Sequence, residues 1–146
     1  MKQQFVYQRD TQVFQTKPNS REAAAINVRL ADAANQVEGT LDQFIDDCMR
    51  YSVAPFEIKL GGGASLTADL WQRQQIFLFD VDNKPEVVGS EPATAEEALL
   101  LFQAAGLPPA AIWTTMSHTP EQPRLRVMIV SREAIANIDQ ARGFLA

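Results

Sequence analysis

One apolar run near the middle of the chain most constrains its fold. Residues 74–81, QQIFLFDV, are too few for an independent helix, and polar residues flank them on both sides. Such a run is typical of a strand buried in a sheet. Alternate residues of a strand face the same side, so Asp80 and Asp82 are expected to project together from its end while Val81 points away.

The segments around this strand carry helix signals. Ser20 and Thr40 are placed to cap helices, and the segment that begins at Thr94 has an acidic first turn and ends at Gly106. In the second of these segments, periodicity predicts that Asp42, Asp46 and Asp47 lie on the outer face. Helices are predicted over 20–37, from Thr40 onward, over 94–105 and over 132–142.

The remaining segments predict strands and turns. The first fifteen residues favour a hairpin or two edge strands on either side of Arg9-Asp10, and GGGASLTAD over 61–69 favours a flexible loop. Strands over 111–117 and 124–130 are expected to form a β-hairpin. These elements predict one α+β domain over 1–146, in which a small mixed or antiparallel sheet carries packed helices.

Composition narrows the class of protein. Hydrophobic residues make up 46% of the chain and charged residues 21%, which is typical of a folded globular domain. Cys48 is the single cysteine, so the chain makes no intramolecular disulfide. The sequence shows neither a signal peptide nor an apolar run of about 18 residues, and it predicts a cytoplasmic protein with no membrane partner.

Net charge bears on nucleic-acid binding. At −5 the chain as a whole repels a polyanion, so contact with nucleic acid requires a local basic patch. Arg124, Arg126 and Arg132 lie close enough together in the sequence to form one. Total charge therefore does not exclude a DNA partner.

Asp80 and Asp82 are the first candidates for chemistry. Two carboxylates on one strand face repel each other unless a cation lies between them, and their oxygens suit Mg²⁺ or Mn²⁺. A strand that ends at the surface with solvated acids gives the same pattern. The pair alone therefore indicates a metal site without establishing one.

The segment Ser117-His118-Thr119 is the second candidate. It contains the only histidine of the chain and lies at the tip of the predicted hairpin, close in sequence to Arg124 and Arg126. A histidine there can donate a hydrogen bond to phosphate, with both hydroxyls as supporting donors. A histidine in a polar turn is also commonly a surface residue, and the arginines also fit a solvent-facing strand edge.

Taken together, these motifs give the chain a family resemblance. The order of strand with DxD, helix, strand with SHT and basic strand resembles the archaeo-eukaryotic primase superfamily, especially primase-polymerase-like domains of plasmid and phage replication proteins. IFLFDVDN looks like the first metal motif of that family, and WTTMSHTPEQPRLRVMIV looks like its hairpin. The resemblance covers residues from about 40 to 131, and it implies an RRM-like catalytic core.

The resemblance implies a role for each candidate residue. Asp80 and Asp82 would bind the metal ions, and His118 would act with them as a catalytic residue that contacts the phosphates of a nucleoside triphosphate. Arg124 and Arg126 match the basic positions after the histidine motif. The implied partners are nucleoside triphosphates, a DNA template and primer, and a helicase domain or replication protein. Ser117 and Thr119 complete the expected nucleotide-binding set.

One departure from the family limits this reading. Its third motif, an acidic residue on a later strand, has no counterpart here, and the surroundings of Asp139 do not match it. The chain is then either the N-terminal part of a longer protein or a half-domain with altered activity. The expected function is a primase/polymerase-type nucleotidyltransferase for DNA replication. The alternatives are a non-catalytic module that binds nucleic acid or a replication protein, and an unrelated α+β domain with coincidental motifs.

Overall fold

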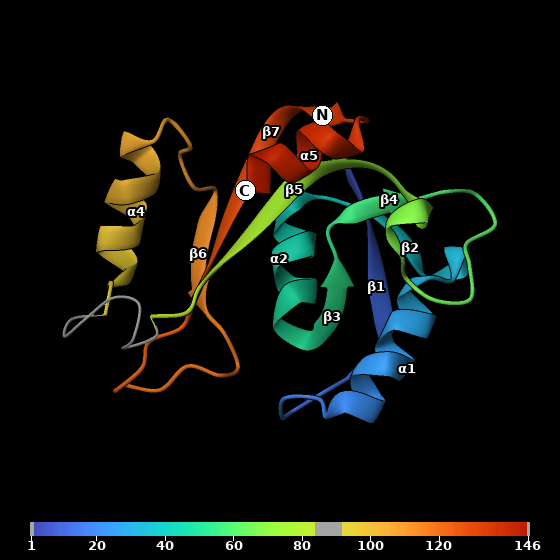
Figure 1. Cartoon of the computed structure of the whole chain (residues 1–146), viewed down its shortest axis with the longest axis horizontal. Helices are drawn as coiled ribbons and strands as arrows, with labels where there is room; N and C mark the ends of the chain where they lie inside the picture. The colour runs from blue at the N-terminus through green and yellow to red at the C-terminus, as the bar shows by residue number, and fades with distance from the viewer. Residues whose placement is uncertain (1, 84–91, 146) are drawn as a thin grey trace. The chain divides into compact units, whose positions relative to one another are not determined.

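The computed structural model describes residues 2–83 and 92–145. Strands and helices are interspersed along this part of the chain (Figure 1), and the predicted α+β class is confirmed. The elements are β1 (Phe5–Val13), α1 (Ser20–Leu30), the 3-10 helix η1 (Ala33–Asn35), β2 (Gln36–Gly39), α2 (Leu41–Arg50), β3 (Tyr51–Ala54), β4 (Phe56–Ile58), the 3-10 helix η2 (Ala68–Leu70), β5 (Trp71–Val81), α4 (Ala95–Ala104), β6 (Ala111–Thr114), β7 (Leu125–Ile135) and α5 (Ile138–Leu145).

The strands form two sheets. The first has the order β2-β1-β3 and the second the order β4-β5-β7-β6. The chain divides into two compact units, which we call unit 1 (residues 1–75 and 132–146) and unit 2 (residues 76–131). The strands β5 and β7 contribute residues to both units. That residues 1–146 act as a single domain stays a prediction.

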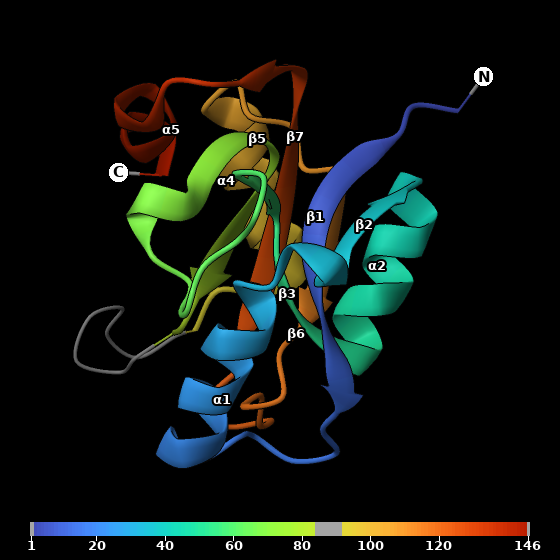
Figure 2. The same ribbon diagram turned by 90° about the vertical axis from the view of Figure 1, so that its right-hand side faces the viewer.

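In unit 1, the helices α1 and α2 cover opposite faces of the first sheet (Figures 1 and 2). Alternation along β1 explains the arrangement, because Tyr7 and Arg9 face α2 while Asp10 faces α1. The Tyr7 ring packs edge-on against Phe44 of α2, with centroids 4.9 Å apart. On the other face, the Asp10 carboxylate accepts hydrogen bonds from Arg29 of α1, at 2.5 Å from Nε and 2.9 Å from Nη2.

The prediction that Asp47 lies on the outer face of α2 is wrong. Asp47 is buried, and its carboxylate accepts a 2.6 Å hydrogen bond from the Tyr7 hydroxyl and further bonds from Arg9. Burial raises the pKa of the Tyr7 phenol, and the hydrogen bond to Asp47 raises it further. The Arg9 guanidinium also lies over the ring of Tyr51. The Asp47 carboxylate can be buried because Tyr7 and Arg9 satisfy it.

Two predictions near the N-terminus also need correction. Residues 5–13 form one continuous strand, since Arg9 and Asp10 find partners on the helices and need not break it. The first helix ends at Leu30, well before residue 37, because β2 then pairs antiparallel with β1. Its cap is Asn19, whose side chain accepts a hydrogen bond from the backbone of Glu22 in a capping box.

The triple-glycine loop after β4 is held to the end of α1 by backbone hydrogen bonds. The backbone N–H of Gly63 donates to the Ala31 carbonyl at 2.9 Å, and that of Leu66 donates to the Asn27 carbonyl at 3.0 Å. Gly62 has a φ of 61°, and a Cβ atom there would lie 2.4 Å from the Ala31 oxygen. Only glycine allows this approach.

In unit 2, α4 packs on one face of the sheet. Phe79 of β5 meets Phe102 of α4 in an edge-to-face contact with centroids 5.3 Å apart. Thr94 caps the helix in a capping box with Glu97, as its sequence predicts. The predicted hairpin is also present, because β6 pairs antiparallel with β7. The core of the unit consists of Ile76, Phe77, Ala98, Leu125, Val127, Met128 and Ile129.

The prediction of a helix over 132–142 is wrong in its first half. The strand β7 continues to Ile135, and the Gln75 side chain donates a 3.2 Å hydrogen bond to the Arg132 carbonyl. Strand pairing thus overrides the helix propensity of this segment. The helix α5 begins only after Asn137, whose side-chain oxygen accepts hydrogen bonds from two backbone N–H groups. Within the described ranges, no helix has the length and apolar character to cross a membrane.

Candidate functional site

Four of the predicted site residues, Asp80, Asp82, Arg124 and Arg126, lie close together in unit 2. Phe79 faces α4, so its neighbour Asp80 projects from the opposite face of β5, and Asp82 follows it there. Arg126 of β7 and Arg124, just before this strand, reach the same face. The strand alternation that predicted a shared face for the two aspartates therefore also places both arginines beside them.

Asp80 and Arg126 form a bidentate ion pair. Arg126 Nε lies 2.7 Å from one Asp80 carboxylate oxygen, and its Nη2 lies 3.1 Å from the other. The Asp80 side chain is 52% exposed and that of Arg126 34%. Because solvent screens a pair with this exposure, it contributes little to stability, and the cost of opening it for a ligand is small.

Asp82 lies in a more crowded corner of the site. Arg124 Nη1 lies 3.9 Å from its carboxylate, and the Gln122 side chain donates to its backbone carbonyl at 3.4 Å. The Nε atom of Arg124 is buried without a hydrogen-bond partner in the described structure. A buried guanidinium N–H without an acceptor carries an energetic cost, and a ligand from solvent cannot reach this atom where it lies.

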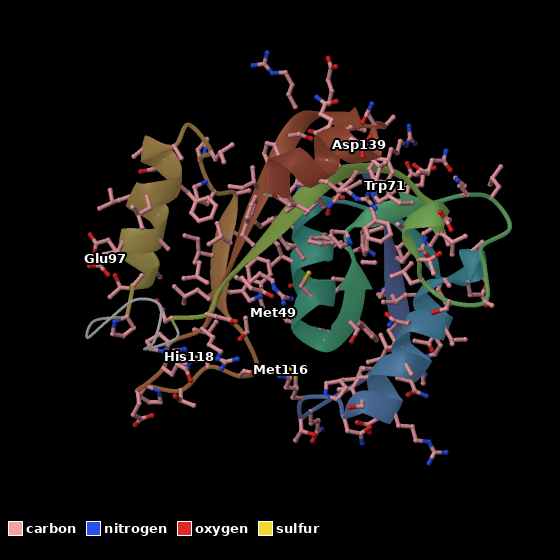
Figure 3. The ribbon with its side chains drawn as sticks, viewed as in Figure 1. Met49, Trp71, Glu97, Met116, His118 and Asp139 are labelled. Atoms are coloured by element: carbon pink, nitrogen blue, oxygen red, sulfur yellow. The ribbon has the colours of Figure 1, made fainter. Side chains whose placement is uncertain are left out.

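His118 lies in the loop that joins β6 to β7 (Figure 3). Its Nδ1 atom accepts a hydrogen bond from the backbone N–H of Arg124 at 3.3 Å. Because an accepting nitrogen carries no proton, the neutral ring is protonated on Nε2, which is then a donor. His118 is exposed, so this donor is accessible to an anion.

The residues beside His118 form a tight loop. The Thr119 hydroxyl accepts a 3.0 Å hydrogen bond from the Gln122 backbone, while its own N–H donates to the Gln122 carbonyl. Ser117 is half-buried in the same loop. The loop therefore brings His118 near the basic strand, and both hydroxyl residues remain candidates as supporting donors.

Asn83 is a site-forming residue whose role the sequence did not reveal. It is buried and has a φ of 45°, which is uncommon for a residue other than glycine. Its side-chain nitrogen donates to the carbonyls of Ala93 and Pro123, and its oxygen accepts from the Ala93 N–H. It thus joins the end of β5 to the segments before α4 and β7. The signal available was its position after Asp-Val-Asp, since asparagine tolerates the left-handed region.

Asn83→Ala is expected to destabilise the protein by about 3 kcal/mol, because it removes three hydrogen bonds and puts a Cβ without a compensating amide at positive φ. Urea denaturation would measure the loss. Asn83→Gly is the matched variant, since it removes the same bonds but relieves the backbone. If Asn83→Ala loses no more stability than Asn83→Gly, the positive φ at this position adds nothing to the cost of the substitution.

The implied metal can be tested against the donors that are present. Two carboxylates two positions apart offer the oxygen ligands that Mg²⁺ and Mn²⁺ prefer, and a Mg²⁺ site is often completed by water and substrate phosphates. Among the residues described, no group of three or more histidine, cysteine or acidic residues could enclose a cation. The donors fit one cation shared with a ligand, and they do not fit a cage made by the protein alone.

The site was predicted from sequence motifs, and its residues lie together. No family model, curated protein or solved structure matches the chain. The resemblance to primases therefore stays a prediction, and the case for a function depends on the site itself. The site offers two carboxylates beside two guanidinium groups, and an exposed imidazole that is hydrogen-bonded to the Arg124 backbone.

Proposed function

We propose that the chain is a primase/polymerase-type nucleotidyltransferase module for DNA replication, which binds a divalent metal together with a nucleoside triphosphate. One observation carries the proposal. Acidic residues at the end of β5 lie beside arginines at the start of β7, and His118 of the β6–β7 loop is hydrogen-bonded to the Arg124 backbone. Metal–triphosphate complexes need both kinds of group.

Each residue has a distinct role in this proposal. Asp80 and Asp82 would hold Mg²⁺ or Mn²⁺, which neutralises phosphate charge when it is bound. Arg126 and Arg124 would bind phosphate oxygens, and the Nε2–H of His118 would donate to the triphosphate. The reaction class is attack of a primer 3′-hydroxyl on the α-phosphate, with pyrophosphate as the leaving group.

The ion pairs affect how the ligands bind. Asp80 and Arg126 neutralise each other, so a cation alone must compete with the arginine, and a triphosphate alone must compete with the carboxylate. A metal and a triphosphate that arrive together supply a new partner to each. We therefore expect metal and nucleotide to bind cooperatively, each raising the affinity for the other.

A calorimetric titration with Mn²⁺ and a nucleoside triphosphate tests the proposal. The chain should bind the pair, and Asp80→Ala with Asp82→Ala should lower that affinity about a hundredfold, because the metal then has no carboxylate ligand. Asp46→Ala, on the exposed side of α2, is the control and should change nothing.

Two results would contradict the proposal: binding that survives loss of both aspartates, or no binding by the unchanged chain. His118→Ala adds a second measurement on the same site. It should weaken binding of the triphosphate more than binding of the nucleoside, since its donor is directed at phosphate. Equal weakening of both would assign His118 to another role.

A second function is favoured by a specific observation. Both aspartates already lie beside arginines, and the described residues bring no third acid to the site. A non-catalytic module that binds DNA or a replication protein would need no more than this. A salt-dependent affinity for single-stranded DNA that is unchanged by chelation of divalent metal would support it.

A further inference from the structure

A second candidate site lies in unit 1, where α5 meets the start of β5. An open hollow of about 330 Å³ is lined there by residues of β4, the loop before η2, η2, β5 and α5. This volume is at the lower end of the range of small-molecule sites. Its apolar lining consists of Phe56, Leu66, Ala68, Trp71, Ile138, Ala141 and Leu145.

A second hollow of about 460 Å³, which we call the polar compartment because its lining includes charged side chains, adjoins the apolar one. Trp71, Ile138 and Arg142 line both, so the two are compartments of one site. Lys59 and Asp69 line only the polar compartment. Figure 3 shows Trp71 beside α5, the helix that carries the labelled Asp139. Trp71 therefore lines both the apolar compartment and the one that carries charged residues.

The backbone around this site is held in place by secondary structure. The Lys59 N–H donates to the Leu70 carbonyl at 2.8 Å, and Ile58 lies opposite Trp71 in the β4–β5 pair. The Trp71 indole N–H donates to the Gln74 side chain at 3.2 Å. With its polar atom satisfied, the indole offers its apolar surface to a ligand.

The charges of the polar compartment indicate the kind of ligand. Lys59 and Arg142 are cationic, and Asp69 is the one carboxylate in the lining. Asp139 lies 3.8 Å from Arg142, but both side chains are largely exposed, so solvent screens their attraction. A ligand that matches this lining carries a carboxylate and an ammonium close together, with an apolar group attached.

We propose that this site binds a free α-amino acid with an apolar side chain. Lys59 and Arg142 bind the α-carboxylate, Asp69 binds the α-ammonium, and the side chain fills the apolar compartment beside Trp71. A fatty acid would bring a second carboxylate next to Asp69, and a nucleotide would bring several negative charges there. Neither complements the lining as a zwitterion does. This proposal is independent of the nucleotide site in unit 2.

Three related compounds test it with the full chain. L-Phenylalanine has both charged groups, 3-phenylpropionate lacks the ammonium, and phenethylamine lacks the carboxylate. The probe is the NMR signal of the Trp71 indole N–H, assigned by comparison with Trp113→Phe. L-Phenylalanine should shift this signal and bind about tenfold more tightly than either analogue, since each analogue leaves a charged lining residue without its partner.

Substitutions should change this preference selectively. Asp69→Asn should remove the preference of the site for phenylalanine over 3-phenylpropionate. Lys59→Gln should reduce the preference of the site for phenylalanine over phenethylamine. Ala68→Phe fills the space shared by both compartments and should abolish binding, whereas Ala64→Phe, in the loop before η2 and outside the lining, should not. Equal binding of all three compounds, tighter binding of either analogue, or no shift of Trp71 with phenylalanine would overturn the proposal.

Discussion

Replacing Arg126 with alanine is expected to change metal binding and triphosphate binding in opposite directions. Arg126 occupies both carboxylate oxygens of Asp80, so its removal opens that carboxylate to a cation. Mn²⁺ alone should then bind more tightly than to the unchanged chain. The substitution also removes two charge-assisted donors, and triphosphate affinity in the presence of Mn²⁺ should fall about ten- to a hundredfold.

Separate titrations with Mn²⁺ alone and with Mn²⁺ plus triphosphate would measure the two effects. Arg132→Ala is the matched control, because Arg132 is an exposed arginine further along β7. It should leave both affinities unchanged. A parallel fall of both affinities would mean that Arg126 only maintains the local structure. No change in either would remove Arg126 from the site.

Asp10→Ala is expected to cause a large loss of stability. Asp10 is fully buried and its carboxylate is the partner of Arg29, which is itself only 22% exposed in its side chain. Removing the acid leaves a partly buried guanidinium without its counter-charge, at a cost of about 3 kcal/mol. Urea denaturation near neutral pH would measure it. Asp42→Ala, which breaks the exposed Lys2–Asp42 pair, should cost less than about 1 kcal/mol.

The Asp10 contribution should also depend on pH. Burial by itself raises the pKa of Asp10, but hydrogen bonds from Arg29 and from backbone N–H groups outweigh it and hold this pKa below its ordinary value of 3.8. The folded state therefore favours the carboxylate. The stabilisation is fully present above the unfolded-state pKa, and it is lost as pH falls through the folded-state pKa. The difference in free energy of unfolding between the unchanged chain and Asp10→Ala should accordingly become smaller in acid. A difference that does not change with pH would contradict this account.

The sequence predicted those elements whose signals are local. Thr40 and Thr94 cap the helices expected of them, and the apolar run before Asp80 forms a central strand. The wrong predictions concern segments whose structure depends on residues far away in the sequence. Arg9 and Asp10 look like a strand break, but side chains on two helices neutralise them inside β1.

The candidate site shows the same division. The period of two along a strand was enough to predict a common face for Asp80 and Asp82, and the hairpin was enough to bring His118 toward Arg124. The register between β5 and β7 could not be read from one sequence. That register decides that Asp80 meets Arg126, and it makes ion pairs of residues that were predicted as separate metal and phosphate ligands.

The loop around Gly62 has a practical consequence for work with this protein. A run of glycines beside an alanine and a serine is where a protein engineer would normally insert an epitope tag or open the chain for circular permutation. In this protein the run is bonded to the end of α1, and Gly62 leaves no room for a side chain beside Ala31. Added residues there would displace the loop N–H groups that donate hydrogen bonds to carbonyls at the end of α1. The segment before Asn19, at the other end of that helix, has no hydrogen bonds of this kind among those described and is the better place for an insertion.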